Sequence, residues 1–252
     1  MKPAPADFEI LGETNDLLAV NKPAGLLVHP TKPDGPRTLW DALRELLGYE
    51  LANGGQVSLI NRLDRETSGT VLVAKSSAAA RTAAMAMQEG KIRKSYLAIV
   101  CGWPEQEAFE VNAPLIRLGE VGESPIHLQR AVHPSGAAAH TRFRVLSRFQ
   151  RREGPFALVS AEPLTGRTHQ IRVHLAHHGH PVVGDKIYGP SPGCYLEFIR
   201  TGWTPALAGR LLLPRHALHS AEMALDWLGS PLAWTCEMPP DMKGFIGGKN
   251  ES

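Results

Sequence analysis

One acidic residue, Asp64, lies between two arginines in residues 61–69 (NRLDRETSG), a polar segment with apolar stretches on both sides. A nearby positive charge keeps a carboxylate ionised even where it is partly buried. An ionised carboxylate is the form that acts as a nucleophile. The same segment is compatible with an ordinary turn in which Asp64 and Thr67 hydrogen-bond their own backbone. Spacing alone favours the turn, so the nucleophile needs support from the rest of the chain.

Histidines form the second group that could do chemistry. They gather in the segment that ends near residue 180: His169, His174, His177, His178 and His180. His174 and His178 have the i, i+4 spacing of metal-binding helices, but no Glu lies between them and no carboxylate follows before Asp185. We therefore expect no metal, and assign these histidines to capping, packing and RNA contact.

No cofactor is expected either. The glycine-bearing residues 119–122 lack the GKS or GKT ending of a phosphate loop and the strand–helix context of a dinucleotide site.

Composition narrows the class of protein. Of the 252 residues, 43% are hydrophobic and 21% charged, which predicts a globular fold with a sizeable core. The net charge of +2 permits an RNA partner without requiring one. Cys101, Cys194 and Cys236 show no CxxC spacing, which argues against a disulfide framework or a zinc site and fits a reducing cytoplasm.

The N-terminal sequence MKPAPADFEILGE carries acids and prolines where a signal peptide needs an apolar stretch. No later apolar run approaches eighteen residues. These features predict a soluble cytoplasmic protein with no membrane partner.

The polar segment that holds Asp64 needs elements to position it. Residues 8–28 predict two extended segments separated by the turn-prone pair Asn15-Asp16. A helix is predicted after Thr38, with Thr38 as its N-cap and Gly48 as its C-cap. Residues 57–60 predict a strand, and the β-branched run TVLVAKS after the polar segment predicts another, followed by an alanine-rich helix over about 76–89. The polar segment is therefore predicted to be a loop between buried strands.

The second half of the chain predicts strands over 96–100, 139–146 and 156–161 and a helix over 169–178. Residues 117–134 and 148–155 are polar and aperiodic, which predicts surface excursions of the kind that touch a large substrate. No repeat or long linker divides the chain, so a single α+β catalytic domain is expected over residues 1–252, with a core of about 8–241 and a flexible tail over 243–252.

Six segments match one family in one order. NRLDRETSG resembles the signature loop of the RluA-type pseudouridine synthases, HRLDxxTSG. The other matching segments are NKPAG with the following VH (21–29), RKSYLA through Gly102 (93–102), LTGRTHQIRVH (164–174), GHP to GD (179–185) and LHSA (218–221). Matches spread from about residue 10 to 240 are far harder to obtain by chance than one short pattern.

The resemblance implies an isomerase, an intramolecular transferase that turns uridine in RNA into pseudouridine without a cofactor. Asp64 would be the catalytic aspartate, Arg167 its basic partner and Tyr96 the aromatic residue against the uracil. A carboxylate can attack C6 of the ring or C1′ of the ribose, and both routes stay open. The arginine would orient the carboxylate through a forked pair.

A base inside a helix must leave the stack before a side chain reaches it. Arg62, two residues before the nucleophile, is a candidate to fill the gap or bind the phosphate, and pairing with Glu66 at the rim of the core is the alternative. The other residues predicted to contact RNA are Arg65, Lys94, His169, Gln170 and Arg172. A run of arginines could add a phosphate track or form a solvated face: Arg142, Arg144, Arg148, Arg151 and Arg152.

The chain departs from the family pattern at Asn61, where histidine is usual. Both side chains form hydrogen bonds, so we expect the loop geometry to survive, whereas a role that needs an imidazole proton is put in question.

The resemblance implies the α+β pseudouridine synthase fold: a large, mostly antiparallel mixed sheet with flanking helices and a central catalytic cleft. The NKPAG segment begins at residue 21, which leaves no room before it for an S4-type domain. The implied partner of this monomer is structured RNA, ribosomal or transfer. Two rival readings are a non-catalytic RNA-binding or chaperone module of the same fold and a small-molecule hydrolase with His169 or His174 as base. Retention of Asp64, Tyr96 and Arg167 together favours the isomerase.

Overall fold

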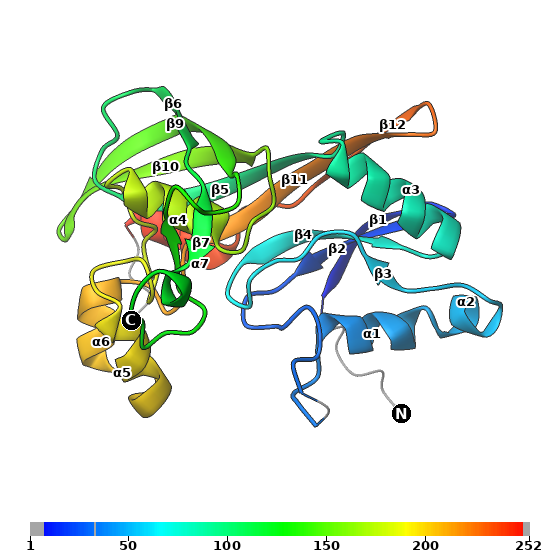
Figure 1. Ribbon diagram of the computed structural model, residues 1–252, viewed down its shortest axis with the longest axis horizontal. Coiled ribbons are helices and arrows are strands. Elements are labelled where there is room, and N and C mark those ends of the chain that lie inside the picture. Colours follow the sequence, from blue (N-terminus) through cyan, green and yellow to red (C-terminus); the bar gives the residue numbers. More distant parts are fainter. Residues whose placement is uncertain (1–7, 33, 249–252) are drawn as a thin grey trace. The chain divides into compact units, whose positions relative to one another are not determined.

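The computed structural model describes residues 8–32 and 34–248 (Figure 1), and they divide into two compact units. The first unit runs to Lys94 and includes His219–Glu237, and the second holds Ser95–Leu218 and the C-terminal segment from Met238. The chain passes between the units within strands β5 (Arg93–Cys101) and β11 (Leu218–Trp227).

The first unit is built on a mixed sheet. Strands β1, β2 and β4 pair antiparallel in that order, β3 joins β4, β12 pairs antiparallel with β11, and β11 runs parallel to β4. Their bounds are β1 Glu9–Glu13, β2 Leu17–Lys22, β3 Ser58–Leu59, β4 Ser68–Ala74 and β12 Ser230–Thr235. Every residue of β4 is buried, as expected of a strand with both faces covered, and its last four residues are apolar.

Helices cover this sheet on both sides (Figure 1). Their bounds are α1 Leu39–Leu46, α2 Gly48–Ala52 and α3 Ser77–Gln88. Small side chains let α3 approach closely: Ala79 and Ala83 pack with Leu17, Leu72 and Met223 in one buried cluster.

The predicted start of α1 is confirmed, since Thr38 forms a capping box with Asp41. The prediction that Gly48 caps its end is wrong. Leu47 closes α1 with φ −94° and ψ 27°, which needs no left-handed residue, and Gly48 is then the first residue of α2.

The second unit holds an antiparallel sheet in the order β5-β10-β9-β6 and a separate two-stranded ribbon of β7 and β8. The strands are β6 Ala108–Asn112, β7 Leu115–Arg117, β8 Arg130–Val132, β9 His140–Arg151 and β10 Gly154–Pro163. The helices are α4 Gln170–His177, α5 Gly193–Thr201, α6 Pro205–Leu211, α7 Pro240–Gly247 and the 3-10 turn Leu118–Glu120. The predicted α+β class with mostly antiparallel strands is confirmed.

Three expectations about polar segments need correction. Residues 117–134 begin and end in the β7–β8 ribbon, and residues 148–155 form the end of the β9–β10 hairpin rather than an excursion. Residues 243–247, expected in a flexible tail, belong to α7, because the buried Phe245 ring packs edge-on against Phe156 with ring centroids 5.1 Å apart. The last four residues of the expected tail, 249–252, lie outside the described residues.

All three cysteines are reduced: Cys101 is half-buried, and Cys194 and Cys236 are buried. Burial raises the pKa of Cys101 and that of Cys236 to about 11. Within the described ranges, no helix is both long and apolar enough to cross a membrane.

We predict that Phe245→Ala lowers the free energy of unfolding by about 3–5 kcal/mol, because it removes a buried ring. The same ring lies 4.3 Å from the Arg151 guanidinium carbon, so that stacking contact is lost as well. Urea unfolding monitored by circular dichroism measures the change. Tyr49→Ala, at a side chain that is 81% exposed, is the control and should change it little. Equal stability of both variants would show that α7 does not dock.

Candidate active site

The loop that carries Asp64 is a turn in the first unit. The Thr67 amide donates to the Asp64 carbonyl over 3.1 Å, and the Asp64 side chain is half-buried. The turn predicted from spacing is therefore present in the backbone. The hydrogen bond of this turn uses the Asp64 backbone carbonyl and not its carboxylate. Asp64 can therefore belong to the turn and also act as a nucleophile.

Asn61 fixes the start of this loop. Its side chain is buried, its amide nitrogen donates to the Thr70 carbonyl over 3.2 Å, and its amide oxygen accepts from the Leu72 amide over 2.8 Å. This position needs one donor and one acceptor side by side, which an amide supplies without a titrating ring. Asparagine thus holds the start of the loop here, and the expectation that it preserves the geometry of the histidine-bearing family loop stays a prediction.

Lys22 fixes the middle of the loop. Its ammonium is fully buried and donates to the carbonyls of Arg65, Pro23 and Leu26 over 3.1, 2.8 and 3.0 Å. The Gly25 amide also donates to the Arg65 carbonyl, and the Arg65 side chain donates back to the Gly25 carbonyl over 3.1 Å. We did not predict Lys22 from the sequence as a site residue, although its NKPAG segment was among the matching motifs.

His219 fixes the end of the loop. Its Nε2 bonds the Cys236 carbonyl over 3.2 Å, and since a carbonyl only accepts, Nε2 carries the proton. Its Nδ1 therefore accepts from the Ser68 hydroxyl over 2.9 Å. Ser68 and His219 are also register partners in the parallel β4–β11 pair.

Gly69 allows this parallel pair to form. Its φ of +111° and the Ser220 carbonyl oxygen, 2.2 Å from where a Cβ would stand, exclude any side chain. The glycine of the TSG sequence therefore has a steric explanation.

Arg62 is exposed and forms no salt bridge among the described residues, so the predicted alternative of an Arg62–Glu66 pair is not seen. Its charge does reach His29. Burial and then the positive charge of Arg62 lower the pKa of that imidazole.

The other two predicted catalytic residues lie in the second unit. Tyr96 is buried in β5, and its register partner on β10 is Ala161. Arg167 is exposed, and its Nε donates to the Ala138 carbonyl over 3.0 Å. The predicted pairing of Arg167 with Asp64 joins residues of two units and stays a prediction.

Gln170 holds the Arg167 loop in shape. It is 4% exposed, and its amide oxygen accepts from the Thr165 hydroxyl over 2.7 Å and from the Arg167 amide over 2.9 Å. Its amide nitrogen donates to the His140 carbonyl and the Thr141 hydroxyl, each over 2.9 Å. The prediction that Gln170 contacts RNA does not fit this burial.

The same correction applies to Arg172. Its guanidinium forms a forked pair with the Asp185 carboxylate at 2.6 and 2.8 Å, and both residues are buried. Burial alone would raise the pKa of Asp185, but Arg172 outweighs it and holds that pKa well below its usual range. Arg172 neutralises a buried charge and is not a surface contact for RNA.

His169 is the strained residue of the Arg167 loop. It adopts φ 60° and ψ 13° immediately before α4, a left-handed conformation that non-glycine residues adopt mainly where the surroundings enforce it. Its Nδ1 lies 2.7 Å from the Tyr188 hydroxyl, which also accepts from the Arg130 amide over 2.9 Å.

Lys94, also predicted to contact RNA, is half-buried, and burial lowers its pKa.

The histidines suggested as metal ligands have other roles. His174 accepts from the Thr141 hydroxyl at Nδ1 and donates to the Ala113 carbonyl at Nε2, and His178 stacks on Phe109 with ring centroids 4.2 Å apart. In the part of the chain that the structure describes, no three His, Cys, Asp or Glu side chains gather to hold a metal ion.

Three of the five arginines of the suggested phosphate track are compensated by carboxylates. Arg142 pairs with Glu110, Arg148 with Glu107 and Arg151 with Glu153. Arg151 also donates to the Phe245 carbonyl, so it fastens α7.

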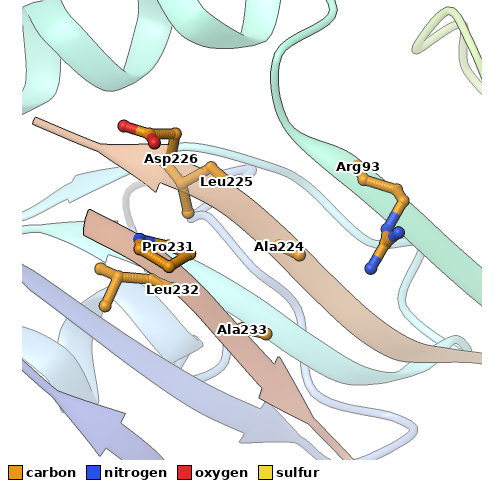
Figure 2. A pocket seen from close by; sticks show the side chains of 7 residues that line it. All are labelled: Arg93, Ala224, Leu225, Asp226, Pro231, Leu232 and Ala233. Atoms are coloured by element: carbon orange, nitrogen blue, oxygen red, sulfur yellow. The ribbon is translucent and has the colours of Figure 1, made fainter. Parts of the chain in front are cut away.

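A shallow pocket of about 360 Å³ opens on the β11–β12 hairpin (Figure 2). Figure 2 shows Leu225, Pro231 and Leu232 on the hairpin and Arg93 beside it. None of the predicted site residues lines this pocket.

Comparison with known proteins gives one consistent result. A family model described as RNA pseudouridylate synthase matches residues 16–177. Ribosomal large subunit pseudouridine synthase D of Yersinia pestis is 34% identical over 254 residues, which cover 97% of this chain and 71% of that protein. The protein of the same name from Nitrosomonas europaea is 36% identical over 243 residues, 95% of this chain and 64% of that protein.

An uncharacterized RNA pseudouridine synthase of Chloroflexus aurantiacus is 41% identical over 230 residues, 88% of this chain and 63% of that protein. The chain thus spans less than two thirds of the length of two of these relatives. Among solved structures, human RNA pseudouridylate synthase domain containing 1 superposes with a TM-score of 0.70 at 26% identity, over 96% of this chain and 89% of that chain. Human RNA pseudouridylate synthase domain containing 4 also superposes with a TM-score of 0.70, at 25% identity, over 93% of this chain and 90% of that chain.

The Ser68–His219 hydrogen bond gives a prediction for stability. Ser68→Ala removes the donor to a buried ring nitrogen, and we expect the free energy of unfolding to fall by about 1–3 kcal/mol. Urea unfolding measures it, with Ser147→Ala at an exposed strand position as the control. A loss at Ser68 no larger than at Ser147 would mean that the bond does not hold β4 to β11.

His174 gives a prediction for pH dependence. Burial is the main reason that its pKa is lowered in the folded protein, while the unfolded side chain titrates near about 6.5. As the pH drops below about 6.5, His174 binds a proton in the unfolded chain more readily than in the folded protein. The free energy of unfolding therefore falls with the pH. We expect His174→Gln to be less stable than wild type at neutral pH. Between about pH 7 and 5, its free energy of unfolding should fall less than that of wild type. Parallel pH profiles of wild type and variant would contradict this.

Proposed function

The chain belongs to the RNA pseudouridylate synthase family, and on that basis we propose that it isomerises selected uridines of structured RNA to pseudouridine, with Asp64 as the nucleophile. The observation that carries the proposal is the loop of residues 61–69. Three separate side chains, Asn61, Lys22 and Ser68, hold its start, middle and end through the hydrogen bonds described above. Buried polar groups that hold one short loop in a fixed geometry also fix the position of the side chain that the loop carries, here Asp64.

The proposed reaction balances without a cosubstrate. The N1–C1′ bond of uridine breaks, and the released uracil turns so that C5 forms the new bond to C1′. N1 gains a proton and C5 loses one. The Asp64 carboxylate adds to C6 or to C1′ and leaves again, so it returns unchanged. The two points of attack remain alternatives.

Two residues of the second unit complete the proposed site. Arg167 would keep Asp64 ionised and oriented through its forked guanidinium. The Tyr96 ring would lie against the uracil, and its hydroxyl would assist removal of the proton from C5. Asp64 belongs to the first unit, so the proposed chemistry draws on both units and residues 1–252 would act as one catalytic domain.

RNA contact is proposed for the predicted residues that remain available to it: Arg62, Arg65, Lys94 and His169. Arg62 would fill the gap left by the extruded uridine or bind its phosphate. The names of two relatives, ribosomal large subunit pseudouridine synthase D, favour large-subunit ribosomal RNA over transfer RNA as the substrate to test first. We propose that the protein works as a cytoplasmic monomer.

The central prediction is that Asp64→Asn lowers pseudouridine formation by about 10⁴-fold or more, because the near-isosteric amide is no nucleophile. The hydrogen bond that closes the turn uses the backbone carbonyl of residue 64, and the amide nearly matches the carboxylate in shape, so folding and RNA binding should be unchanged. Carbodiimide-based mapping of total RNA from cells lacking the gene, complemented by wild type or by Asp64→Asn, identifies the target. One or a few sites should vanish with the gene and return with wild type alone.

Arg167→Lys is the companion variant. It keeps the charge but loses the fork, and turnover should fall on the order of a hundredfold with folding intact. Restoration of all sites by Asp64→Asn, or no change of any site on loss of the gene, would favour the non-catalytic RNA-binding module.

A further inference from the structure

The β7–β8 ribbon places two arginines opposite each other. Arg117 on β7 and Arg130 on β8 are register partners in an antiparallel pair. Like charges at directly opposed positions destabilise such a pair. The stability of the ribbon therefore does not explain why both residues are arginine.

The two charges are compensated unequally. Arg117 Nε lies 3.1 Å from Glu120, and its Nη1 donates to His127 Nε2 over 2.7 Å, which makes His127 a neutral acceptor. Arg130 forms no salt bridge within residues 8–32 and 34–248, and its Nε is buried without a hydrogen-bond partner there.

A buried donor of a charged group that lacks an acceptor costs free energy, and each such group in a native protein calls for an explanation, of which a bound ion is one. Arg130 as a whole is half-buried, so part of its side chain is accessible to solvent. A negatively charged hydrogen-bond acceptor would satisfy this donor and neutralise the charge of Arg130.

The ribbon is also fastened to the loop that carries Arg167. The Arg130 amide donates to the Tyr188 hydroxyl, and that hydroxyl contacts Nδ1 of His169, two residues after Arg167. A ligand on Arg130 would thus lie on an element linked by two hydrogen bonds to the proposed catalytic loop.

We propose that Arg130, with Arg117 beside it, binds a backbone phosphate of the substrate RNA. A phosphate oxygen pair matches the guanidinium fork, carries the missing charge and offers acceptors to two arginines at once. The assignment of RNA as the source of the phosphate rests on the proposed function, whereas the anion site itself rests on the ribbon alone.

The test measures binding rather than turnover. Purified, protein-free large-subunit ribosomal RNA is titrated with Asp64→Asn protein, which binds without reacting, at several KCl concentrations between about 50 and 200 mM. Arg130→Ala in that background should bind about tenfold more weakly and show a salt slope smaller by about one, the signature of one lost phosphate contact. Arg130→Lys should keep the slope but not the full affinity.

Arg210→Ala is the matched control. It removes one positive charge from the same unit, where Arg210 is exposed and pairs with Glu197. In the Asp64→Asn background, this variant should keep the RNA affinity and the salt slope of the Asp64→Asn protein itself. Arg130→Met, which keeps the aliphatic stem, replaces the alanine variant if circular dichroism shows that the latter misfolds.

The outcomes separate the two proposals. Reference affinity and slope in Arg130→Ala or Arg130→Met, or an equal change in the control, overturn the phosphate site whatever the enzyme activity. Displacement of RNA by inorganic phosphate at matched ionic strength, seen only while Arg130 is present, supports the proposal, because RNA and free phosphate then compete for the same guanidinium. If the Arg130 variants bind RNA more weakly but no pseudouridine depends on Asp64, the phosphate site is supported and the proposed isomerase activity is overturned.

Discussion

The buried ammonium of Lys22 is the constraint on which the candidate site depends. Removing a charge from water costs several kcal/mol unless other groups replace its hydration. Three backbone carbonyls do so here, from Pro23, Leu26 and Arg65. Two of these carbonyls belong to the segment that follows the lysine and the third belongs to the Asp64 loop, so the ammonium ties that segment to the loop. A guanidinium would not fit the same three acceptors, because its donors lie in a planar fork.

Much of the fold was readable from local pattern, because α1, α3, α4 and the strands beside the Asp64 loop are coded by nearby residues. The β7–β8 ribbon, the β11–β12 hairpin and α7 were missed, and for α7 the reason is that it depends on partners far along the chain. Phe245 shows this well, since it stands in a glycine-containing segment near the C-terminus while the rings it packs on lie about ninety residues earlier.

The candidate site was predicted unevenly for the same reason. The position of Asp64 on a turn followed from sequence. Gln170 and Arg172 were mistaken for RNA contacts, since their burial follows from Thr141 and Asp185, which no local pattern connects to them. Polar residues of a matching motif therefore divide into those that act on a substrate and those that hold the loop, and only the folded structure separates them.

The raised thiol pKa values have a practical consequence for labelling chemistry. Maleimide dyes react with the thiolate, and a thiol of pKa about 11 is ionised in only about one molecule in 10⁴ at neutral pH. Cys101 and Cys236 should therefore react slowly, and Cys194 is shielded by burial. A single cysteine placed at the exposed position of Tyr49 would take a fluorophore first. The protein can thus be labelled for fluorescence measurements of RNA binding with its native cysteines left in place.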